Sequence, residues 1–127
     1  MKKVKEAVYN SLTTDATLTS LLGTGNRVFS FWPETLAVYP SITFFEVSTT
    51  REPARDLWRS TYQIDVWGKP QDDVDSIVER IIKLFDGQTL SIGTVDNCFG
   101  GKVETISEDS DGEIKRRIID VTFFSLL

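Results

Sequence analysis

Residues 60–87 read STYQIDVWGKPQDDVDSIVERIIKLFDG, and within this stretch the spacing of the apolar side chains changes. At first Tyr62, Ile64 and Val66 occupy every second position, which is the pattern of a β-strand with one packed face. Further on, apolar residues recur every three or four positions, as they do along the buried face of an α-helix. The sequence therefore predicts a strand that is followed by a helix over residues 74–85.

The other segments complete an α+β pattern. An apolar stripe over residues 4–12 predicts a first helix, and a second one begins at Thr14 or Asp15, either of which can cap it, and ends at Gly23. The order of elements predicts one α+β domain over residues 1–127, with a mainly antiparallel or mixed sheet, helices packed on one face and a C-terminal β-hairpin. The expected strands are residues 27–31, 41–47, 58–67, 102–108 and 113–124.

The composition excludes most catalytic chemistry. The chain has no histidine and a single cysteine, Cys98, whose neighbours Asn97 and Phe99 supply no cation to activate it. Histidine-dependent nucleophiles and imidazole metal sites are therefore excluded. The composition does not exclude a hydrolase whose catalytic groups are carboxylates alone, such as Glu46, Asp65 or those at the tip of the last hairpin. It would need two carboxylates about 5–9 Å apart, and no spacing here suggests them. We expect no enzyme, no cofactor and no metal.

The net charge argues against a nucleic-acid-binding protein. Lys and Arg total 14 against 19 for Asp and Glu, which gives a net charge of −5. Tight binding to a phosphate backbone requires clustered cations. No run approaches the roughly 18 apolar residues of a membrane span. We expect neither specific nucleic-acid binding nor contact with a membrane.

Four carboxylates gather at the tip of the C-terminal hairpin: Glu108, Asp109, Asp111 and Glu113. They flank an Asp-Gly pair, the strongest short signal for a β-turn. A calcium-binding loop would need further oxygen ligands at fixed offsets and flanking helices, and the sequence shows neither. The tip is therefore expected to be a solvated turn.

Several strands carry apolar residues on both faces. Ile118 and Phe124 of the last strand project from the face opposite to Ile119, and the strand at residues 41–47 has the same pattern. Three helices can cover one face of a small sheet but hardly both. The second face is therefore covered either by the connection at residues 32–39 or by another copy of the chain.

Five short runs of this sequence resemble the tail-completion proteins of long-tailed bacteriophages and prophages. The run LTTDATLTSLLG at residues 12–23 is followed by RVF and by YPSITF at residues 39–44. STYQIDVWG at residues 60–68 then precedes an amphipathic helix that ends LFDG at residues 84–87. The resemblance covers roughly residues 10–90, and it extends to the related tail terminators of siphophages.

The resemblance implies a structural protein of the virion, assembled in the bacterial cytoplasm. Such proteins form a ring, usually a hexamer, that terminates the tail at the head-proximal end of the tail tube. The expected partners are further copies of the chain, the tail tube protein and the head-tail connector protein. An assembly protein on the head side of the neck would have a similar size and composition, and it stays open as the alternative.

Within such a ring, the polar arm at residues 48–56 and the second apolar face of the sheet are the candidate contacts between subunits. The acidic tip is a candidate for the lumen or for one end of the ring, where negative charge would repel passing DNA. The contact residues would be Arg51, Glu52, Arg55, Ile118 and Phe124, and those of the tip Glu108, Asp109, Asp111 and Glu113.

Overall fold

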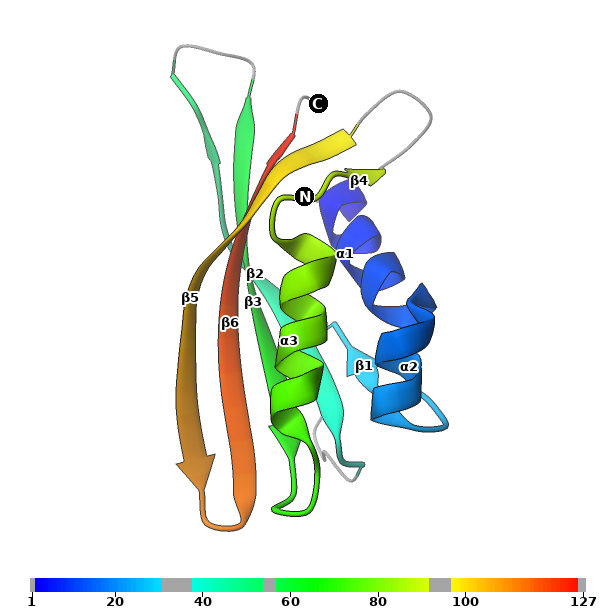
Figure 1. The fold of residues 1–127 in the computed structure, drawn as a ribbon. Coiled ribbons are helices and arrows are strands. Elements are labelled where there is room, and N and C mark those ends of the chain that lie inside the picture. Colours follow the sequence, from blue (N-terminus) through cyan, green and yellow to red (C-terminus); the bar gives the residue numbers. More distant parts are fainter. Residues whose placement is uncertain (1, 31–37, 54–56, 92–96, 126–127) are drawn as a thin grey trace.

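The computed structural model describes residues 2–30, 38–53, 57–91 and 97–125, and within these ranges three helices and six strands follow one another along the chain (Figure 1). The helices are α1 (Lys2–Thr14), α2 (Ala16–Leu22) and α3 (Val74–Phe85). The strands are β1 (Val28–Phe29), β2 (Ser41–Arg51), β3 (Trp58–Gly68), β4 (Leu90–Ser91), β5 (Asn97–Asp111) and β6 (Ile114–Ser125). The predicted α+β class and C-terminal hairpin are confirmed.

In the described part of the chain the strands form one sheet in the order β1-β2-β3-β6-β5-β4. β1 runs parallel to β2, and every other neighbouring pair is antiparallel. The sheet is therefore mixed, which is one of the two arrangements that the sequence left open. All three helices lie on one face of the sheet (Figure 1), so the predicted covering of a single face is confirmed.

Helix α3 forms where the sequence predicts it because it combines a cap with an apolar stripe. The carboxylate of Asp73 accepts hydrogen bonds from the Ser76 N–H at 3.2 Å and the Ser76 hydroxyl at 2.6 Å, which satisfies the first turn. Ile77, Ile81 and Phe85 lie on one side of the helix and are buried against the sheet. The helix thus presents to the sheet the face that its spacing defines.

The core lies between the helices and the sheet. Phe44, Ile64 and Ile119 are neighbours in register on β2, β3 and β6, and all three are fully buried. The rings of Phe85 and Phe123 meet edge to face at 5.6 Å between centroids, which joins α3 to this layer. Each such side chain contributes about 1.5–3 kcal/mol by leaving water, so this layer fixes how the helices sit on the sheet.

Asp15 links α2 to α3 through hydrogen bonds and an ion pair. Its carboxylate caps α2 by accepting the Leu18 N–H at 2.9 Å, and it accepts two further hydrogen bonds from Arg80 of α3 at 2.8 and 2.6 Å. The hydrogen bonds from Arg80 are the main reason why the pKa of Asp15 lies below its ordinary value. Of the two caps that the sequence allowed, the structure therefore selects Asp15.

Several strands differ in length from the sequence prediction, among them β5, which was expected over residues 102–108 and spans Asn97–Asp111. β1 is shorter, with Val28 and Phe29 alone, and the expected Phe31 lies outside the described residues. β2 is longer, because its ladder with β3 continues through polar pairs such as Thr50 and Arg59. These pairs are polar, so the segment has no apolar alternation from which a strand could be predicted.

The turn of the C-terminal hairpin is tighter than predicted. β5 continues to Asp111, which pairs with Ile114, so only Gly112 and Glu113 make the turn. Gly112 has a φ of 58°, a left-handed conformation that glycine adopts without cost. Asp109 and Asp111 are consequently strand residues and not part of an open loop.

Candidate assembly surfaces

Two hairpins project from the sheet beyond the helices, and they do so at opposite ends (Figure 1). The far ends of β2 and β3 form one of them, here called the β2–β3 arm, where Arg51 pairs with Trp58. The ends of β5 and β6 around Gly112 form the other, the acidic tip. Each subunit therefore carries one projection toward each end of the strands.

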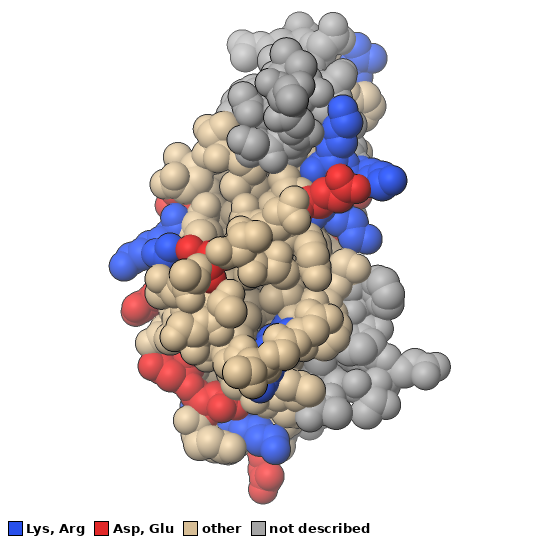
Figure 2. All heavy atoms as spheres, turned by 90° about the vertical axis from the view of Figure 1, so that its right-hand side faces the viewer, with Lys and Arg blue, Asp and Glu red and all other residues tan. Residues whose placement is uncertain are grey.

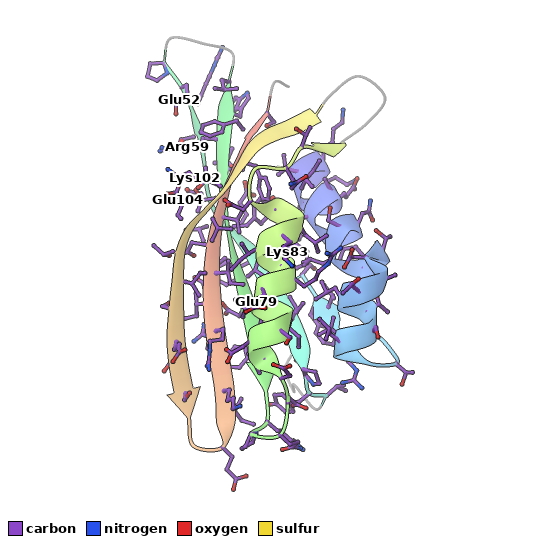
Figure 3. The ribbon with its side chains drawn as sticks, in the orientation of Figure 1. Glu52, Arg59, Glu79, Lys83, Lys102 and Glu104 are labelled. Carbon is purple, nitrogen blue, oxygen red and sulfur yellow. The ribbon has the colours of Figure 1, made fainter. Side chains whose placement is uncertain are left out.

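The β2–β3 arm is polar and only loosely tied together. The Arg51 guanidinium lies 5.9 Å from the centroid of the Trp58 ring, and Arg59 approaches Glu52 at 4.0 Å. Both members of the second pair are well exposed, and such pairs contribute little to stability. Glu52 and Arg59 lie on the side of the sheet away from the helices, beside Lys102 and Glu104 (Figure 3). Arg55, also expected in this contact, lies outside the described residues.

The sheet face away from the helices is apolar only in part. Phe45 and Val47 on β2 are 40% and 54% exposed, whereas Ile118 and Phe124 on β6 are half-buried. Along the middle of this face runs a shallow groove whose lining is mainly polar, in contrast to the expected apolar surface. The groove residues include Arg59, Thr61, Gln63, Thr105, Asp120 and Thr122.

Asp65 lies on this second face, yet it is only 1% exposed, whereas the sequence indicated a polar strand residue facing solvent. Its carboxylate accepts hydrogen bonds from Gln63 at 3.0 and 3.2 Å and from Arg116 at 2.8 Å. Arg116 also covers the Trp67 ring at 4.7 Å from its centroid. Arg116 is 51 positions away along the chain, so no local pattern could have revealed this partner.

The four acids of the tip lie apart on two faces of the hairpin. Glu108 pairs with Arg117 at 3.3 Å, and Asp109 pairs with Arg116 at 3.5 Å from the opposite face. Arg117 also approaches Asp75 of α3 at 3.5 Å, which ties the hairpin to the helix layer. Glu113 is exposed in the turn, and the side chain of Asp111 is outside the description. The tip is therefore less negative than its sequence suggests, because two of its acids have an arginine partner.

The outer surface of α2 and of the second half of α1 carries few charges, whereas the first half of α1 holds Lys2, Lys3, Lys5 and Glu6. In Figure 2 uncharged side chains fill the centre of this face, and charged ones lie toward its margin. In a hollow between α1, α2 and β1, the Arg27 guanidinium donates to the backbone carbonyls of Thr24, Tyr39 and Pro40 at 2.9, 2.9 and 3.2 Å. That cation is therefore used within the fold. A surface depleted of charge is typical of the centre of protein–protein contacts.

The described part of the chain offers neither a metal site nor a membrane span. Within residues 2–30, 38–53, 57–91 and 97–125, no three acidic or cysteine side chains come together in a way that could hold a metal ion. None of the helices in these ranges has the length and apolar character that crossing a membrane requires.

Comparison with known proteins defines first the class and then the family. The chain is a structural protein of the bacteriophage tail, since it matches such a family over residues 6–124. It belongs to the family described as tail completion protein gp17. The protein is accordingly a component of the virion.

The fold has a counterpart among solved structures. A chain from the virion of a native gene transfer agent particle superposes with a TM-score of 0.77 at 16% sequence identity, over 96% of this chain and 93% of the other. At this identity the likeness shows a shared fold. No curated protein sequence matches the chain.

Proposed function

We propose that the protein forms a closed ring, a hexamer in the assembled tail, at the head-proximal end of the tail tube, where it terminates the tail and joins it to the head connector. The match to a tail-completion family over residues 6–124 is the observation that carries this proposal. The projections at both ends of the strands support it, because a ring built from such subunits has two rims with which to meet two partners (Figure 1).

In this ring one domain of residues 1–127 makes each subunit, and the β2–β3 arm contributes to the contact with a neighbour. The polar face of the sheet or the acidic tip lines the path of the DNA. Among the described residues, the groove on that face is lined by one cation, Arg59, together with Glu104 and Asp120, and a lining without an excess of positive charge lets phosphates pass without holding them. An assembly protein on the head side of the neck remains the second candidate, and it differs only in the structure to which the protein binds.

The site of action can be tested with a phage or prophage that lacks the gene. We expect full-length tails and filled heads that remain separate, and purified protein added to this lysate should bind the tails at one end and restore joining. Electron microscopy of the tails with a tagged protein measures this directly. Binding to isolated heads, with none to tails, would instead establish the neck alternative.

The contribution of the tip can be tested by replacing Glu108, Asp109, Asp111 and Glu113 with the matching amides. The protein should stay folded, because amides keep the shape of the acids and the ion pairs of exposed carboxylates contribute little to stability, but head joining or DNA delivery should fail. Reversing the charge of Glu79, an exposed residue of α3 (Figure 3), is the control and should leave infectivity unchanged. Normal infectivity of the amide variant would show that the tip is only a solvated turn.

A further inference from the structure

β2 has a strand beside it on its outer side for only a small part of its length. β1 pairs with Ile42 and Thr43 alone, and the Ile42 N–H donates to the Arg27 carbonyl at 2.7 Å, which shows that Ile42 directs its backbone away from β3. Since backbone groups alternate along an antiparallel strand, Phe44 directs its own groups the same way. From Phe44 to Thr50, no other strand of the described residues lies on that side.

β5, at the other side of the sheet, is covered only at its beginning. β4 pairs with Asn97 and Cys98, and the Val103 N–H donates to the Asp86 carboxylate at 3.0 Å. From Thr105 to Asp111 the strand has no neighbour other than β6 among the described segments. Because Asp111 and Ile114 close the two-residue turn, the alternate residues 106, 108 and 110 direct their backbone groups outward.

The two uncovered segments are complementary in direction. β2, β3, β6 and β5 alternate in direction across the sheet, so β5 of one subunit and β2 of the next would run antiparallel. Exposed apolar side chains lie on both segments but on opposite faces: Phe45 and Val47 of β2 are on the face away from the helices, whereas Ile106 of β5, in register with the buried Ile119, is on the helix side. An uncovered edge of this kind is a template for pairing with another chain.

We infer that the occupant of each edge is a second copy of this chain, with β2 residues 44–50 of one subunit pairing with β5 residues 105–111 of the next. The contact is heterologous, because one edge meets a different edge, and repetition of such a contact closes a ring when the rotation permits. The inference rests on the proposed ring and specifies the surface that builds it. It also gives the ring one continuous antiparallel sheet.

The positions of the two segments fix how neighbouring subunits are staggered. β6 serves as a common ruler for the two segments. Glu46, near the middle of the β2 segment, pairs with Tyr62, which pairs with Val121 of β6. Glu108, in the middle of the β5 segment, pairs with Arg117 of β6. For the two segments to pair, each subunit must therefore be displaced along the strand direction by about four residues, or ~14 Å, relative to its neighbour. Each subunit contributes four strands, or ~19 Å, to the circumference of the ring. This corresponds to strands tilted by roughly 35° from the ring axis, at the lower end of the 35–45° range of closed β-barrels.

The same segments explain why the free protein need not assemble. Each uncovered edge is only about seven residues long, and irregularities interrupt the ladders between Glu46 and Ser48 and between Val103 and Thr105. Bulges of this kind bend a strand and weaken pairing at an edge. The edges are expected to pair when subunits are brought together on the end of the tail tube.

Cysteine cross-linking in assembled tails tests this contact. In a Cys98→Ser background, Val47→Cys is combined in one chain with Thr105→Cys, Ser107→Cys or Asp109→Cys, all at exposed positions. Paired strands bring Cα atoms within the 4.4–6.8 Å that a disulfide needs. The control partner is Lys102→Cys, because Lys102 is level with Ser48 and would meet Val47 only in a ring without stagger.

We expect oxidation of the tails to give covalent multimers up to the size of the whole ring with at least one of the three staggered partners. The Lys102 control and the single-cysteine variants should stay monomeric on a non-reducing gel. Multimers with Lys102 alone, or none from any pair in tails whose end ring is visible by electron microscopy, would overturn the edge contact and leave the proposed function standing. Tails that carry no ring of this protein would refute the ring itself, and with it this contact.

Discussion

Replacing Asp65 by alanine should destabilise the protein more than replacing any exposed carboxylate on the same face. The Asp65 carboxylate is buried and accepts hydrogen bonds from both Gln63 and Arg116. Its removal leaves Arg116 with Asp109 at 3.5 Å and the Trp67 ring as its remaining partners, and the Arg116 Nε already lacks an acceptor among the described residues. A partly buried cation would then be poorly compensated.

The magnitude follows from the burial of the two partners. Breaking a fully buried ion pair costs about 3–5 kcal/mol. Asp65 is 1% exposed, but Arg116 is 25% exposed and can turn partly toward water. We therefore expect a loss of about 2–3 kcal/mol in the free energy of unfolding, which for a domain of this size lowers the melting temperature by roughly 10 °C.

Urea unfolding followed by tryptophan fluorescence measures this loss, since Trp58 and Trp67 lie in the same strand as Asp65. Asp120→Ala is the matched control. Asp120 is a carboxylate on the same face, but it is more exposed and accepts from Thr105 at 2.7 Å, so its loss should cost below about 1 kcal/mol. If Asp65→Ala and Asp120→Ala were equally stable, the buried carboxylate would not hold this part of the sheet, and the reasoning would be wrong.

Two further predictions concern stability. Because Arg80 lowers the pKa of Asp15, this carboxylate contributes stability that is present above its ordinary pKa of 3.8 and is lost as the pH falls through the lower folded value. Asp15→Asn should keep the cap but abolish this loss in an acid titration of unfolding. Asp15→Ala should lower the free energy of unfolding by about 1 kcal/mol more than Asp15→Asn does. Gly101→Ala should cost about 1–3 kcal/mol in urea unfolding, because its Cβ would lie 2.3 Å from the Phe85 carbonyl oxygen. Ser107→Ala, on the exposed part of β5, is the control, and equal stability of these two variants would contradict the steric argument.

The elements that could be predicted from the sequence are those whose signal is local. Helix α3 and the inward face of β3 follow from periodicity, and the cap at Asp15 and the turn at Gly112 follow from single residue types. The same holds for the packing of helices on one face, since their order along the chain determines it.

The features that escaped prediction depend on distant contacts or on the exact register of a hairpin. The sheet places β6 beside β3, so Asp65 meets Arg116, and no spacing in the sequence encodes this pair. Glu108 meets Arg117 because the β5–β6 turn is tighter than the sequence predicted, and with the looser turn the tip looked like one acidic cluster. The uncovered edges also depend on how far β1 and β4 extend, and strand ends are the least predictable boundaries.

The position of β6 has a consequence for the synthesis of the protein. β6 joins the β2–β3 half of the sheet to the β5–β4 half, yet it is the last of the strands to leave the ribosome. At 5–20 residues per second, the edge of β3 that pairs with β6 stays open for several seconds while the rest of the chain is made. The fold therefore closes only after residues 114–125 have emerged, and a nascent chain that stalls before them exposes this open edge of β3, which chaperones or proteases can bind.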